Sequence, residues 1–206
     1  AETVQRWTPP PVDIDPDKQA EARRRVEQAQ RDGQLFETSE SAIPLWLALL
    51  EQDPQDRRAR DGLQRAQRQL LVQAKALLAQ PQQQRMALAE AAQIALVLLT
   101  IAPDNEQARL LQRQVEVAQR TVAFNRAGED DLRAGRIGED GDGALVNFRE
   151  ALALDPDNVR ARQGLAAAES GLIGRAEIAA RAGDVAAAGT WPAAATKVRD
   201  VATANA

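Results

Sequence analysis

Asp155-Pro156-Asp157-Asn158 closes one apolar helical run of this chain and opens the next. Two other stretches carry the same signal, and an Ala-Arg pair follows each of the three copies. The copies are Asp53-Pro54-Gln55-Asp56 with Ala59-Arg60, Ala102-Pro103-Asp104-Asn105 with Ala108-Arg109, and the quoted stretch with Ala161-Arg162. Because an apolar helical pattern stands on both sides of every copy, the repetition indicates a solenoid of helices.

Proline explains why one helix ends at each copy and another begins. It fixes φ, lacks an N–H and restricts the residue before it, yet the first turn of a helix tolerates it. The acidic and amide residues after each proline satisfy free backbone N–H groups and suit the positive end of the helix dipole. Each copy therefore predicts a helix stop joined to a helix start.

The composition favours helix over sheet and limits the partners. The chain has 206 residues, with only three tryptophans, three phenylalanines and no tyrosine, and we expect almost no strand. Its 30 acidic and 26 basic residues give a formal charge of −4, which offers no general attraction to nucleic acid or to an anionic membrane. No apolar run reaches the ~18 residues of a membrane span. We expect neither nucleic-acid binding nor membrane insertion of this segment.

The chain contains no cysteine and no histidine. This removes thiol nucleophiles, the usual imidazole base, disulfides and the common zinc ligands together. Neighbouring carboxylates such as Asp130 and Asp131 point apart on a helix, and no phosphate-binding glycine loop accompanies them. We expect no enzyme activity, no cofactor and no catalytic residue.

The pattern along the chain predicts a linker followed by one helical-repeat domain. Residues 1–16 are rich in proline and alternate with polar residues, which is typical of an extended linker, although Trp7 could dock on the first helices. Residues 17–206 form a single domain, with units at about 17–53, 54–102, 103–155 and 156–206. The first helix of a pair is long in three of them, at about 55–79, at about 104–134, and from near Ala161 to a stop at Gly183.

Two windows of the chain are in register. Pro54 lies 21 residues after Gly33, and Pro156 lies 21 residues after Gly135. The matched apolar positions are Ala42 with Ala144, Ile43 with Leu145, Trp46 with Phe148, and Leu50 with Leu152. Because Trp46 and Phe148 occupy matched positions, we expect both to be core residues.

The second of these windows resembles a tetratricopeptide (TPR) repeat. The resemblance is carried by Ala144, Phe148, Ala151, Leu152, Leu154 and Pro156, with Leu165 following. It covers roughly residues 35–185 as degenerate, elongated units. It implies an all-α fold, a right-handed α-solenoid of antiparallel helix pairs whose first helices line a groove for a peptide or a partner helix.

One subclass of that family clamps a C-terminal carboxylate with lysine and asparagine at fixed places. In this chain those places hold Asp61 and Arg65, Leu110 and Gln114, and Gln163 and Ala167. The carboxylate clamp is therefore absent, and the resemblance supplies no defined ligand.

A second resemblance concerns the stretch GEDGDGALVNFREALALDPDN at 138–158. It is similar to segments of bacterial multidomain proteins that join a serine/threonine kinase or a formylglycine-generating-enzyme-like domain to a helical spacer. The resemblance implies a bacterial segment outside the cytoplasm, for example in the periplasm, although the composition assigns no compartment. Because the chain starts at Ala1 without methionine, we expect a piece of a longer protein.

Arginines at one repeat position are the first candidates for partner binding. Arg60, Arg109 and Arg162 recur six residues after each proline, so they could form a ladder facing an acidic peptide. The alternative is that they pair with Asp53 or Asp155 or are solvated. Further candidates on the same long helices are Arg57, Arg65 and Arg113. With Arg58 and Arg68, the first two make the helix at about 55–79 locally basic, so that it could meet an acidic partner segment; a solvated helix face is again the alternative.

The loop at 138–143 offers weak candidates for a metal site. Asp140 and Asp142 are hard oxygen ligands between glycines, as calcium prefers, but the spacing differs from the usual calcium loop. The alternative is that Asp142 caps the helix that begins near Gly143. We expect no metal.

From the sequence we therefore expect a non-catalytic scaffold or peptide-binding module of the TPR-like class. Its partner is a protein or peptide segment, or a neighbouring domain of the same chain. The alternative is a rigid spacer or a regulatory segment of a larger bacterial enzyme.

Overall fold

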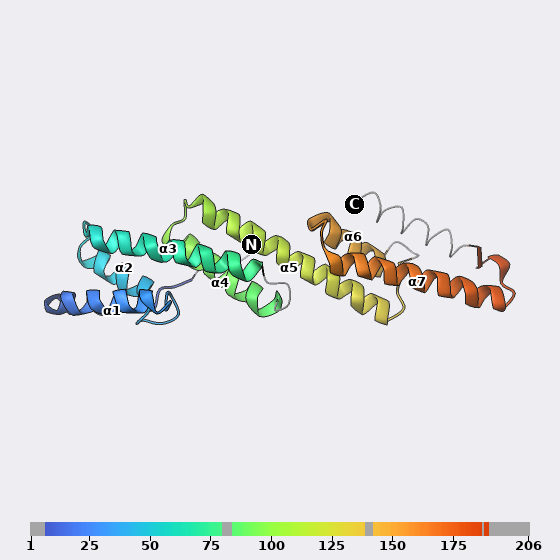
Figure 1. The fold of residues 1–206 in the computed structure, drawn as a ribbon, viewed down its shortest axis with the longest axis horizontal. Coiled ribbons are helices and arrows are strands. Elements are labelled where there is room, and N and C mark those ends of the chain that lie inside the picture. The colour runs from blue at the N-terminus through green and yellow to red at the C-terminus, as the bar shows by residue number, and fades with distance from the viewer. Residues whose placement is uncertain (1–6, 80–83, 139–141, 187, 190–206) are drawn as a thin grey trace. The chain divides into compact units, whose positions relative to one another are not determined.

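The computed structural model describes residues 7–79, 84–138, 142–186 and 188–189. Over these residues the chain forms seven α-helices and no strand, which confirms the all-α prediction. The helices, drawn in Figure 1, are α1 (Gln19–Arg31), α2 (Ala42–Gln52), α3 (Arg57–Leu78), α4 (Gln84–Ile101), α5 (Glu106–Arg133), α6 (Ala144–Leu154) and α7 (Val159–Arg181). A short 3₁₀ helix, Pro16–Lys18, precedes α1. The long helices predicted at about 55–79 and 104–134 are α3 and α5.

Packing divides the chain into two units, Ala1–Val115 and Glu116–Ala206. In the first unit α1 packs against α2, α2 against α3, and α3 against α4; in the second, α6 packs against α7. Each unit has its own apolar core. The single repeat domain and its four helical units stay predictions.

The described part of the N-terminal segment differs from a free linker. Residues 7–15 form no helix, yet Ile14 is buried and both Trp7 and Val12 pack against the first core. The side chain of Gln52 donates a hydrogen bond to the carbonyl oxygen of Ile14. The segment is thus anchored on the first unit. Residues 190–206 of the predicted unit 156–206 lie outside the described residues.

Each Asp-Pro or Ala-Pro signal forms the same turn. The third residue after the signal's start caps the next helix, since Asp56 accepts from the N–H of Ala59 at 3.1 Å and Asn158 from that of Ala161 at 2.9 Å. Asn105 accepts in the same way from the N–H of Ala108 at 3.3 Å, and also from that of Gln107 at 2.9 Å. The predicted capping by acidic and amide side chains is therefore confirmed at all three copies.

The short helices α2 and α6 begin without a side-chain cap. Their first two N–H groups instead donate to carbonyl oxygens of the preceding loop. The bonds run from Ala42 to Gln34 and from Ile43 to Leu35 in the first unit, and from Ala144 to Arg136 and from Leu145 to Ile137 in the second, at 2.8–3.1 Å. The predicted capping of α6 by Asp142 is wrong, because Gly143 holds the N-cap position and these loop carbonyls take the free donors.

Both loops start at a glycine in the left-handed region. Gly33 follows α1 with φ of 75°, and Gly135 follows α5 with φ of 74°. Residues with a Cβ adopt this conformation at a cost, and a glycine there closes a helix. The two windows that match in sequence therefore also match in backbone conformation.

A buried aromatic ring on a glycine holds each unit together. Trp46 and Phe148 are both fully buried, as predicted for core residues. A Cβ built on Gly62 of α3 would lie 2.3 Å from the Trp46 ring, and one on Gly164 of α7 would lie 2.3 Å from the Phe148 ring. Both distances are far below van der Waals contact, so the rings occupy space that only a glycine leaves open.

The contact between ring and glycine predicts that a glycine-to-alanine substitution in the helix lowers the stability of the chain instead of raising it. Replacing a helix-interior glycine by alanine normally stabilises by about 0.5–1 kcal/mol. Gly164→Ala instead destabilises by about 1–3 kcal/mol, because the Phe148 ring must move. Urea unfolding of the full chain, followed by circular dichroism, measures the change.

Gly174→Ala is the matched control, because it lies in the same helix and a Cβ there meets nothing within 4 Å. It is expected to be neutral or stabilising. Equal gains in both variants would contradict the packing described here.

A partly buried ion pair joins α1 to the start of α3. The Asp56 carboxylate, 8% exposed, lies 2.6 Å from the guanidinium of Arg23. The hydrogen bond from Arg23 lowers the pKa of Asp56 below its usual 3.8, burial opposes this, and the N–H of Ala59 adds to the lowering. The same carboxylate thus caps α3 and ties it to α1.

The lowered pKa of Asp56 predicts acid sensitivity of the first unit. The pair contributes stability above the unfolded value near 3.8, and this contribution is lost as the pH falls through the lower folded-state pKa. Asp56→Asn keeps an oxygen for the cap but removes the charge. Its free energy of unfolding should therefore fall less steeply between pH 5 and 2 than that of the parent chain, measured by urea titrations. Parallel pH profiles would refute the assignment.

Candidate functional site

A groove of about 750 Å³ lies between α1 and α3 in the first unit. Residues of one face of each helix line it. They are Glu27, Gln30 and Arg31 of α1, with Arg65, Arg68, Gln69, Val72 and Gln73 of α3. Its volume falls in the range of about 300–1,000 Å³ found for ligand sites.

A polar network underlies the floor of the groove. The indole N–H of buried Trp46 donates to Gln30 Oε1 at 2.9 Å, and Gln30 Nε2 donates to Gln69 Oε1 at 2.9 Å. Gln30 is itself only 8% exposed. The network satisfies the buried indole and links it to Gln69, an exposed residue of the groove wall.

The charges along the groove are unequal. The carboxylate of the groove, that of Glu27, forms an ion pair with Arg58, whose Nε lies 3.0 Å from Glu27 Oε1. Arg31 donates to the neutral Gln28 at 2.7 Å. Arg65 and Arg68 are exposed, and neither forms an ion pair or a hydrogen bond with another residue of the described part. The groove therefore presents positive charge without a matching acid.

The second unit repeats the structural frame of this groove, with each residue 102 positions later. The frame consists of the buried aromatic ring, the glycine on which it packs, and a Glu–Arg ion pair between two helices. Glu129 of α5 pairs with Arg160 of α7, as Glu27 of α1 pairs with Arg58 of α3. The hydrogen bond from Arg160 lowers the pKa of Glu129, and the same bond raises that of Arg160. The ion pair between neighbouring helices is therefore part of the shared frame.

Most residues that line the groove are not repeated, although Glu27 and Arg31 have counterparts in Glu129 and Arg133. Gln30 is replaced by Leu132 and Gln69 by Gly171. The other replacements are Arg65 by Ala167, Arg68 by Ser170, Val72 by Gly174 and Gln73 by Arg175. The Ile137 side chain occupies the space at Gly171, where a Cβ would meet it at 2.8 Å. At the place of the groove the second unit thus lacks the two unpaired arginines and the glutamine pair.

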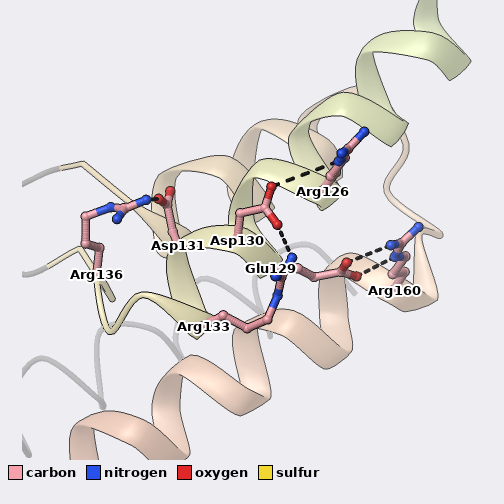
Figure 2. Close-up of polar contacts among 7 residues, drawn as sticks. All are labelled: Arg126, Glu129, Asp130, Asp131, Arg133, Arg136 and Arg160. Atoms are coloured by element: carbon pink, nitrogen blue, oxygen red, sulfur yellow. Dashed lines mark hydrogen bonds and ion pairs between the residues drawn. The ribbon is translucent and has the colours of Figure 1, made fainter.

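Charged side chains of the second unit satisfy one another at this end of α5. Figure 2 shows Glu129 turned toward Arg160, while the next two acids of α5 face arginines of their own. Asp130 pairs with Arg126 and Arg133, and Asp131 with Arg136. The labelled arginines are therefore occupied, unlike Arg65 and Arg68 in the first unit.

The three repeated arginines lie at the turns. The guanidinium groups of Arg60, Arg109 and Arg162 donate to the carbonyl oxygens of Pro54, Pro103 and Pro156. Each also contacts the side chain after its proline: Gln55 at 2.9 Å, Asp104 at 2.9 Å and Asp157 at 3.2 Å. The pairing with Asp53 or Asp155 does not form, because the guanidinium groups bind the proline carbonyls and the side chains that follow them instead.

The remaining sequence candidates lie apart. Arg57 is exposed at the start of α3, and Arg113 lies with Arg109 beside a shallow depression of about 360 Å³ on α5. Asp142 is exposed and Asp140 lies outside the described residues. The described residues contain no acid cluster suited to a metal ion, and none of their helices is long and apolar enough to cross a membrane.

The sequence pattern indicates the basic face of α3 with Arg65 and Arg68, but it does not indicate Arg31 or the glutamine pair of the groove. These residues belong to two helices, and only packing brings them together. A useful signal was present: Gln30 falls on the apolar line of Val26 and Ala29. A polar residue at a buried position needs a partner, here the indole of Trp46.

No protein-family model, no curated protein and no solved structure matches this chain. The functional interpretation therefore rests on the residues and their geometry.

The replacement of Trp46, Gln30 and Gln69 by Phe148, Leu132 and Gly171 predicts energetic coupling. Gln30→Leu alone leaves the indole N–H of Trp46 buried without an acceptor, which costs about 1–3 kcal/mol. The double variant with Trp46→Phe removes that donor as well and should lose less than the two single losses added together. Urea unfolding of the four chains measures the coupling. Additive losses would contradict the network.

Proposed function

We propose that this chain is a non-catalytic module that binds a segment of another protein in the groove between α1 and α3. The observation that carries the proposal is the groove itself, with unpaired arginines on a wall that the second unit does not repeat. The two units share the same frame but carry different side chains at the place of the groove, so the fold does not require the groove residues of the first unit. Such a surface is free to serve recognition.

The proposal includes a finer architecture, a right-handed TPR-like solenoid of antiparallel helix pairs. It is supported by the packing of successive helices from α1 to α4 and by the three equivalent proline turns. In such a solenoid α1 and α3 are first helices of successive pairs. The groove then lies on the surface that repeat proteins of this kind use for binding.

The lining of the groove favours binding over catalysis. It contains arginine, glutamine, valine and one glutamate, and that glutamate is held by Arg58. None of these side chains forms a nucleophile and base pair with another. Arginine and glutamine instead supply several hydrogen-bond donors suited to a peptide.

The test is selection of peptides from an unbiased display library on the full chain. The parent chain is expected to enrich peptides that Val72→Trp no longer binds, because Val72 is 69% exposed in the groove and an indole there fills it. Titration calorimetry with the synthesised peptides measures the loss, expected to exceed tenfold.

Ile178→Trp is the matched control. Ile178 is 68% exposed on α7 of the second unit, so the substitution adds the same bulk at similar exposure away from the groove. It should leave binding unchanged. If no peptide depends on the groove, the module does not bind segments there, and the spacer or regulatory segment of a larger bacterial enzyme becomes the better account.

A further inference from the structure

The charge of the groove restricts what it can hold, an argument that rests on the proposed function. Arg31, Arg65 and Arg68 line it, against the single carboxylate of Glu27. That carboxylate is already shared with Arg58 at 3.0 Å. A ligand that enters the groove therefore meets net positive charge, which favours carboxylates and disfavours lysine and arginine.

Arg65 and Arg68 carry the strongest part of this charge. They lie three residues apart on α3, about 4.5 Å along the axis, and no other described residue pairs with them. Elsewhere in the chain arginines commonly have acidic partners, as Arg160 does with Glu129. Two neighbouring guanidinium groups without partners repel each other, and an added carboxylate relieves that repulsion.

The second unit shows that neither arginine is needed for the fold. Ala167 and Ser170 occupy the matching places in α7, on the same frame of ring, glycine and ion pair. Substituting these residues into α3 therefore removes the charge with side chains that this architecture accepts.

The groove also offers an apolar contact beyond the arginines. Val72 is 69% exposed and lies one further turn along α3 from Arg68. From Arg65 to Val72 the helix advances about 10 Å, which an extended peptide covers in about three to four residues. A short segment thus reaches both the charged and the apolar part.

We propose that the groove selects acidic segments, with Asp or Glu side chains on Arg65 and Arg68 and an apolar side chain against Val72. Arg65 and Arg68 are then the specificity-determining residues. Carboxylate to guanidinium hydrogen bonds are strong and directional, and their loss at two arginines is expected to weaken binding at least tenfold.

The test compares two display selections, one on the parent chain and one on the Arg65→Ala, Arg68→Ser double variant. The groove-dependent peptides of the parent chain are expected to be acidic, and those of the double variant are expected to have lost that bias. The strongest parent peptide is then synthesised with its acids and, separately, with Asn and Gln in their place. Calorimetry at 50 and 300 mM salt compares the two.

Replacing the acids of the peptide is expected to lower its affinity for the parent chain at least tenfold. In the double variant, which lacks both arginines, the same replacement is expected to lower the affinity less. Affinity of the acidic peptide should also fall with salt. Arg120→Glu, an exposed arginine of α5 in the second unit, controls for the change in net charge and should change affinity little. Groove-dependent peptides that are neutral or basic overturn the acidic preference and leave the proposed function standing; peptides that ignore Val72→Trp overturn both.

Discussion

Each unit depends on one contact, an aromatic ring seated on a glycine of the following helix. Trp46 lies on Gly62 and Phe148 on Gly164, at distances that admit no Cβ. Because the glycine lets the ring reach the backbone, the short helix fits closely against the long one. Burial of such a ring contributes about 1.5–3 kcal/mol, and any side chain in place of the glycine forces the ring out.

The ring also determines what surrounds it. A buried tryptophan has an N–H that needs a hydrogen-bond acceptor. In the first unit Gln30 accepts this hydrogen bond, and its amide group in turn donates to Gln69. A phenylalanine brings no donor, and in the second unit Leu132 and Gly171 stand at those places. The polar floor of the groove is therefore a consequence of the choice of aromatic residue. The arginines above it are an independent addition, since the frame exists without them.

The sequence predicts the helices well because their signals are local. Proline with an acidic or amide residue ends one helix and caps the next, and matched apolar positions identified Trp46 and Phe148 as core residues. The site was harder to predict. The recurrence of Arg60 is visible in the sequence, but its contact with the carbonyl of Pro54 depends on the turn geometry. The groove joins α1 to α3 across about 40 residues, and no local pattern reports that proximity.

The central claim is that the two units share a frame and that, within the described residues, the groove with two unpaired arginines belongs to the first unit. Hydrogen–deuterium exchange of the full chain with and without a selected acidic peptide tests it most directly. The account predicts added protection at 27–31 and 65–73 and none at the matching segments 129–133 and 167–175. Equal protection of both sets, or protection confined to the second, would contradict it.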